Sequence, residues 1–154
     1  GSVAGSISAT NGTFAGTLVM TGKITATTAG IDVPTAAIGT CYSSTYTPTL
    51  TAVGNIAAST AYLCNFSRSG NRVEVDGSVD IDPTATGATT LGISLPVASN
   101  FSDTLQGNGT ATASASTEVF ALNADSANDR MTMQGIVVDI TNHNIRFQFG
   151  YRVI

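Results

Sequence analysis

The side chains that most often carry out chemistry are few in this sequence. His143 is the only histidine, and it lies between two asparagines in a segment that we expect to be a surface turn. A Ser-His-Asp triad is formally possible, but no G-x-S-x-G elbow supports it. The sequence shows neither a Cys/His metal cluster nor a phosphate-binding loop. We therefore predict no enzyme activity, no catalytic residue, no cofactor and no metal.

One group of carboxylates is regularly spaced. Glu74, Asp76, Asp80 and Asp82 alternate with apolar residues, so on a strand they share one face, with neighbours two residues apart separated by about 7 Å. Such carboxylates could collect Ca²⁺, meet a basic partner surface or cleave a glycoside as a pair. We favour a solvated sheet face that contacts Arg72 or an arginine of an adjacent chain, because a flat strand face rarely forms the required cleft.

The two cysteines leave two interpretations open. If Cys41 and Cys64 pair, they close a loop of about twenty residues and add roughly 3 kcal/mol of stability. Free, partly buried thiols are the alternative, and we favour it.

Composition narrows the class of protein. Charged residues make up 10% of the 154 residues, and the formal net charge is −4 with only six basic residues, which argues against a nucleic-acid partner. No apolar run is long enough for membrane insertion. Abundant Thr, Val and Ile, with Gly, Asn and Asp to form turns, favour β-structure.

The chain after about residue 46 is expected to form successive strands. In "AYLCNFSRSGNRVEVDGSVDID" a two-residue turn at Gly70-Asn71 pairs Phe66 with Val75, Cys64 with Gly77 and Tyr62 with Val79. In "GIVVDITNHNIRFQFGYRVI" a turn at Asn142-His143 pairs Ile140 with Ile145, Val138 with Phe147, Ile136 with Phe149 and Asp139 with Arg146.

Three further strands complete this region. They are "TTLGISLP", in which Leu91, Ile93 and Leu95 face inward, "NGTATASAS" and "TEVFALNA", with a turn at "ADSANDR" before the next strand. Seven or eight short strands without a helical stripe predict an all-β, antiparallel sandwich or jelly roll.

The first part of the chain differs in composition from the rest, as in "GSISATNGTFAGTLVMTGKITATTAGI". Its large apolar residues are widely spaced among glycines and threonines: Ile7, Phe14, Leu18, Ile24 and Ile31. They bury too little apolar surface to offset the backbone entropy of ordering the segment alone. Identical copies around a threefold axis could share one core. A flexible linker is the alternative, but a linker does not need recurrent Ile, Phe and Leu.

These stretches together resemble bacteriophage fibre proteins, which place Gly/Thr-rich trimeric β-stems ahead of a β-sandwich tip. The stem resemblance lies in residues 5–34, and "YTPTL…NIAASTAYLCNFSRSGNRVEVDGSVDIDPT", "TTLGISLPVASNF" and "FQFGYRVI" carry the tip resemblance. The resemblance implies a homotrimer, with residues 1–40 as an intertwined stem and residues 41–154 as the tip. It also implies a virion protein, assembled in the bacterial cytoplasm and joined to the rest of the fibre.

The expected function is attachment to a bacterial surface glycan or outer-membrane protein by three equivalent weak sites. Loops on a rigid scaffold typically carry such binding, and the candidate loops are 69–72, 98–109, 124–130 and 141–144, with Asn71, Asn108, Asp125, Asn142 and His143. Tyr42 and Tyr46 could stack on a ligand, although packing at the junction is the interpretation that we favour. The alternatives are a capsid-decorating head fibre and a monomeric carbohydrate-binding module of a secreted bacterial protein.

Overall fold

The computed structural model describes residues 31–32 and 40–154. The predicted stem residues Ile7, Phe14, Leu18 and Ile24 lie outside this part of the chain, and of Ile31 only its place in a strand is described. The described elements are β1 (Ile31–Asp32), β2 (Thr40–Tyr46), β3 (Leu50–Gly54), β4 (Ile56–Ala61), β5 (Cys64–Ser69), β6 (Arg72–Pro83), β7 (Gly87–Ser94), the short 3₁₀ helix η1 (Thr104–Gln106), β8 (Gly107–Ala113), β9 (Val119–Asp125), β10 (Arg130–Val137) and β11 (His143–Arg152).

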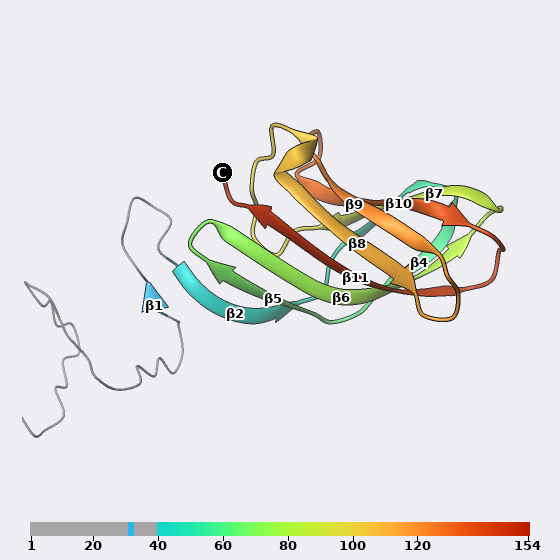
Figure 1. The fold of residues 1–154 in the computed structure, drawn as a ribbon, viewed down its shortest axis with the longest axis horizontal. Helices are drawn as coiled ribbons and strands as arrows, with labels where there is room; N and C mark the ends of the chain where they lie inside the picture. The colour runs from blue at the N-terminus through green and yellow to red at the C-terminus, as the bar shows by residue number, and fades with distance from the viewer. Residues whose placement is uncertain (1–30, 33–39) are drawn as a thin grey trace, which may run out of the picture.

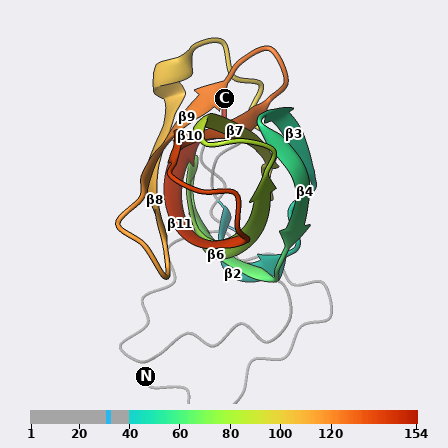
Figure 2. The ribbon, with the colours of Figure 1, turned by 90° about the vertical axis from the view of Figure 1, so that its right-hand side faces the viewer.

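The strands form one antiparallel sheet, as the composition predicts, and this sheet is strongly curled (Figures 1 and 2). Its strand order is β1-β2-β5-β6-β11-β8-β9-β10-β7-β3, and β4 pairs with the second half of β6. Because only Asn55 separates β3 from β4, the chain itself links the β7 side of the sheet to the β6 side.

Asn55 holds this corner. It has a left-handed backbone (φ 57°), which asparagine tolerates better than most residues. Its side chain binds the β6–β7 loop: Nδ2 donates to the Ala85 carbonyl at 2.7 Å, and Oδ1 accepts from Ala85 N–H at 2.8 Å and from the Thr84 hydroxyl at 2.7 Å.

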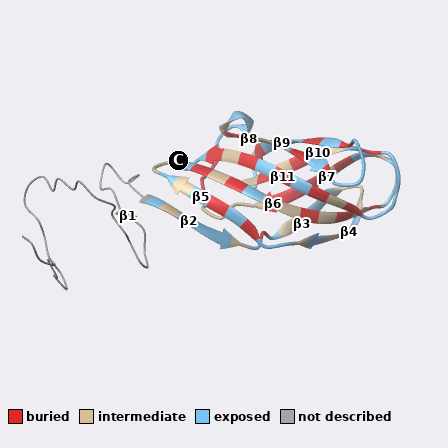
Figure 3. Ribbon diagram, turned by 60° about the horizontal axis from the view of Figure 1, so that its bottom comes forward, coloured by how far each residue is buried: buried red, intermediate tan, exposed pale blue. Residues whose placement is uncertain are grey.

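The core lies inside the curl. Buried and exposed residues alternate along the central strands (Figure 3), because successive side chains of a strand point to opposite faces. The largest fully buried side chains include Phe120, Phe149, Ile81, Leu91 and Ile93. The described core is built entirely from residues between Cys64 and Tyr151, and Tyr42 and Tyr46 pack edge-on against Phe66 at its margin. These two tyrosines therefore pack in the fold, as favoured above.

The first predicted hairpin is confirmed except at its far end. Ser69 pairs with Arg72 across the Gly70-Asn71 turn, Phe66 pairs with Val75, and Cys64 lies against Gly77. The pairing of Tyr62 with Val79 is wrong, since Ala61 takes that place. Three residues lie between Ala61 and Asn65, whereas two lie between their partners Val79 and Asp76 on β6. The chain therefore bulges outward there, and Tyr62 reaches the outer face.

The second predicted hairpin is wrong. β10 pairs with β9 and β7, and β11 lies between β6 and β8. Ile136, Val138 and Ile140 are consequently 67%, 68% and 63% exposed. Arg146 pairs with Ser78 and Thr112, not with Asp139. β9 and β7 occupy both edges of β10, so β11 cannot pair with it, and residues 138–142 form the loop that leads to β11.

The remaining strand predictions agree with the structure. Leu91 and Ile93 on β7 are fully buried and Leu95 packs against the core, while "NGTATASAS" and "TEVFALNA" contain β8 and β9. "ADSANDR" forms the turn between β9 and β10. The only helical element of the described residues is η1, which has three residues.

Candidate functional site

The predicted binding residues lie at two opposite ends of the sheet. We call the end that holds the start of β2, the β5–β6 turn and the end of β11 the proximal end, and the end that holds loops 84–86, 114–118 and 138–142 the distal end. Asn71, Asn108 and Asp125 lie toward the proximal end, and Asn142 and His143 lie at the distal end. The structure therefore does not bring the five together into one site.

Asp125 stabilises the turn between β9 and β10. Its Oδ2 accepts from Arg130 Nε at 2.8 Å and from Asn128 Nδ2 at 2.9 Å, and both members of the Asp125–Arg130 ion pair are partly buried. Burial would raise the pKa of the Asp125 carboxyl, but the hydrogen bonds from Asn128 and Arg130 and the Arg130 charge outweigh burial and hold the pKa below its ordinary value.

We expect this carboxyl to contribute to acid sensitivity. Its folded-state pKa is lower than its unfolded value of about 3.9, so its contribution to stability is present above that pH and is lost as the pH falls through the folded pKa. Asp125→Asn should therefore lose less unfolding free energy than the wild type between pH 6 and pH 2, measured by urea denaturation at each pH. An acid dependence equal to that of the wild type would contradict this role.

The distal end holds a buried pair of ionisable side chains. His143 is 6% exposed and Glu118 is 7% exposed, and His143 Nδ1 lies 2.9 Å from Glu118 Oε2. Glu118 also accepts from the Ser116 hydroxyl at 2.9 Å and from Val138 N–H at 2.7 Å. The pair thus connects loop 114–118, the first residue of β11 and loop 138–142.

The prediction that His143 lies in a surface turn is wrong. His143 begins β11 and pairs with Ile81, and its Nε2 lies 3.3 Å from Asp139 Oδ1. Both ring nitrogens therefore face acceptors, and Ser116 donates to Glu118 instead of His143. A Ser-His-Asp relay needs a serine hydroxyl on the histidine, and this cluster does not provide one. Its contacts are those of a structural connection between the distal loops.

The acidic stripe on β6 lies on the outer face, and most of its carboxylates have neutral or basic partners. Glu74 Oε1 lies 2.5 Å from Arg72, as favoured above. Asp80 accepts from the Tyr62 hydroxyl at 2.6 Å and from Asn144 at 2.7 Å, and Asp82 accepts from Asn142 at 3.0 Å. No group of three metal-ligating side chains that could hold an ion is found among residues 31–32 and 40–154.

The two cysteines are both free. Cys41 is exposed and Cys64 is buried, where burial raises the pKa of its thiol. Cys64 fills the space that Gly77 leaves on the facing strand. The open question of a pairing between Cys41 and Cys64 is thus resolved in favour of free thiols.

A groove follows the outer face of β6, β11 and β8. It consists of two adjoining hollows of about 470 and 280 Å³ that share Thr110 and Gln148. We call it the outer groove, and its outward side chains are Arg72, Glu74, Asp76, Ser78, Asn108, Thr110, Thr112, Arg146 and Gln148. Strand pairing arranges them in rows: Ser78, Arg146 and Thr112 form one row, and Asp76, Gln148 and Thr110 form the next.

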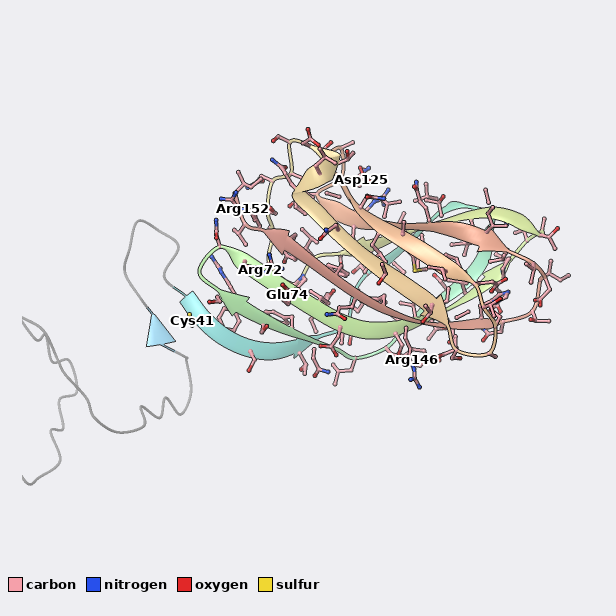
Figure 4. All side chains as sticks on the ribbon, in the orientation of Figure 1. Cys41, Arg72, Glu74, Asp125, Arg146 and Arg152 are labelled. Carbon is pink, nitrogen blue, oxygen red and sulfur yellow. The ribbon has the colours of Figure 1, made fainter. Side chains whose placement is uncertain are left out.

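The third row of the groove contains a glycine for a steric reason. Gly150 pairs with Glu74 and Asn108, and the Glu74 carboxylate lies directly over it, so that a Cβ there would approach Glu74 Oε2 to 2.8 Å. Figure 4 shows Arg72 and Glu74 near the proximal end and Arg146 extending away from the sheet. The groove is therefore open, polar and lined by side chains from three fully paired strands.

Arg146, Gln148 and Glu118 were not among the site residues predicted from the sequence. Arg146 and Gln148 alternate with Phe147 and Phe149, so their outward direction was readable from the sequence, but the neighbours across the sheet were not. Asn108 alone among the predicted binding residues lines the groove.

No model of a known protein family matches the chain. A comparison with curated proteins also gave no match. Within the described part of the chain, no helix has the length and apolar character required to cross a membrane.

Proposed function

We propose that this chain is a stem-and-tip part of a homotrimeric bacteriophage fibre that attaches the virion to a bacterial surface receptor without covalent chemistry. In this proposal residues 1–40 form the intertwined stem, and residues 41–154 form a sandwich-like tip. The proposal is supported chiefly by the contrast between the two parts. The described core draws only on residues between Cys64 and Tyr151, whereas the first 30 residues carry sparse apolar side chains that need a partner.

The arrangement of the described domain fits this role. β1 joins the sheet through β2 at the proximal end, next to the β5–β6 turn, which leaves the distal end and the outer faces accessible (Figure 1). Paired strands on both sides of the groove hold its side chains rigidly, and three copies of a weak site gain avidity because the second and third contacts become intramolecular.

The test is the mass of the purified chain by light scattering, followed by adsorption to bacteria. We expect three times the chain mass of 15.6 kDa, and we expect Phe14→Asp or Ile24→Asp to weaken assembly because each places a charge in the shared stem core. Thr13→Asp is the matched control and should assemble normally. A monomeric wild type would overturn the fibre proposal and favour a carbohydrate-binding module, and a trimer that adsorbs to no bacterium would favour a head fibre.

A further inference from the structure

We propose that the outer groove binds an uncharged, hydroxyl-rich glycan chain lying along β11. This inference names the ligand of the proposed attachment function, and it takes that function as its premise. The two hollows extend from Arg146 to Gly150 on β11, a length of about 14 Å at the rise of an extended strand. The larger hollow, at about 470 Å³, falls within the size range of ligand sites.

The groove side chains are available to a ligand. Among the described residues, Arg146 makes no ion pair, and the side chains of Arg146, Gln148 and Thr110 make no hydrogen bond within the protein. Asp76 has one neutral partner, Asn65 Nδ2, at 3.2 Å. Neighbouring rows of the groove therefore hold a carboxylate, a guanidinium, an amide and hydroxyls. These groups make no hydrogen bonds to one another.

A second outer hollow provides the contrast. The hollow of about 490 Å³ over β7, β9 and β10 is similar in size and also holds one acid and one base, Asp125 and Arg130. There the two groups form an ion pair at 2.8 Å, and the Arg130 guanidinium lies over Gly92. Its charged groups are paired with each other. In the outer groove Arg72 and Glu74 form an ion pair, whereas Asp76 and Arg146 are not paired with each other.

The chemistry of the groove selects a glycan over other polymers. A peptide strand cannot be added, because β11 is already paired with β6 and β8 over its length. A nucleic acid would meet the carboxylates of Glu74 and Asp76. Of the two arginines that line the groove, Arg72 is already paired with Glu74, so only Arg146 is free to neutralise a phosphate. Sugar hydroxyls both donate and accept, so they can bind Asp76 and Arg146 at once. The groove holds two carboxylates, Glu74 and Asp76, and two arginines, Arg72 and Arg146, so its charges balance, and we therefore infer an uncharged chain.

The test uses native electrophoresis of the whole chain through gels that contain dextran, mannan, galactan or arabinoxylan, with polygalacturonate as the acidic comparison. We expect at least one neutral polysaccharide to retard the protein. Arg146→Ala and Gln148→Ala should each weaken this binding, the former about tenfold, as for the loss of one charge-assisted hydrogen bond. Arg152→Ala, on the outer face of the same strand, and Gln134→Ala, in the other hollow, are the matched controls and should bind as the wild type does.

The inference is overturned if no neutral polysaccharide retards the protein, if polygalacturonate is bound more tightly, or if the control variants lose as much affinity as the groove variants. Its failure can be distinguished from that of the proposed function. If the trimer adsorbs to bacteria equally well with and without Arg146→Ala, the attachment function stands and the groove is not its binding site. If the chain is a monomer and its glycan binding depends on Arg146, the groove is a glycan site and the fibre proposal is wrong.

Discussion

Glu118→Ala is expected to lower the free energy of unfolding by about 3 kcal/mol. The substitution removes the acceptor of the His143 ring, the Ser116 hydroxyl and Val138 N–H in one step. His143 then stays in a site that water hardly reaches. It and the partly buried Val138 amide each lose a hydrogen bond that the unfolded chain would make with water. The measurement is the unfolding free energy from urea denaturation at neutral pH.

Glu74→Ala is the matched control for Glu118→Ala. It removes the same side chain from an ion pair with Arg72 on the exposed outer face, where both groups are solvated. We expect a loss below 1 kcal/mol there, as is usual for surface pairs. Equal effects of the two substitutions would contradict the inference that the Glu118–His143 pair holds the distal loops. Amide hydrogen exchange adds a local readout, since Glu118→Ala should increase exchange in residues 138–142 while residues 69–72 remain as in the wild type.

Phe120→Ala is expected to cost 3–5 kcal/mol, the range for deleting a large aromatic side chain from a packed core. Phe120 is 1% exposed and lies over Gly135 on the neighbouring strand β10. The substitution removes a ring from the centre of the curl, and the paired strands on both sides limit how far the sheet can collapse into the space. Thermal and urea denaturation measure the loss.

The neighbouring residue provides the control for Phe120→Ala. Val119 is 63% exposed on the opposite face of β9, so Val119→Ala should change stability by no more than about 0.5 kcal/mol. Gly135 offers an independent check, because a Cβ at that position would contact the Phe120 ring. Gly135→Ala should destabilise the wild type by about 1–3 kcal/mol and the Phe120→Ala variant by much less. Additive effects of the two substitutions would contradict the contact.

Phe120→Ala and Glu118→Ala change different parts of the molecule. Phe120 tests the core that keeps the sheet curled, and Glu118 tests a polar connection that positions loops 114–118 and 138–142. The outer groove depends on neither side chain directly, because its side chains come from the outward positions of β6, β8 and β11. A variant that loosens the distal loops can therefore retain glycan binding, which separates stability from recognition.

Several features of the fold were predictable from the sequence because their causes are local. Alternation placed Val73, Val75 and Ile81 in the core, and a left-handed glycine at Gly70 forms the β5–β6 turn. The turn at "ADSANDR" likewise joined two strands that are consecutive in the chain. The outward direction of Glu74, Asp76, Asp80 and Asp82 followed from the same period of two, and the structure confirms it.

The identity of the neighbouring strands was not predictable in the same way. Nearly every strand alternates apolar and polar residues, so many antiparallel partners can keep one face in the core, and the pattern does not choose between them. The predicted pairing of Val138 with Phe147 satisfied alternation as well as the actual pairing of Phe147 with Gly77 and Ala111. The choice came from the chain's connections and from the fit of core side chains, such as Phe120 over Gly135.

The sequence alone thus determined that this protein is all-β, which residues of β5, β6 and β7 point inward, and where most turns lie, because each of these follows from the conformations of a few consecutive residues. It did not determine that Ile136 and Val138 are exposed or that His143 is buried. Only the tertiary structure decided that Glu118 meets His143 across 25 positions of the chain and that Arg146 lies in a row with Ser78 and Thr112. The physical reason is that such contacts arise from strands brought together by shared burial, and burial specifies a face of each strand without specifying its neighbour.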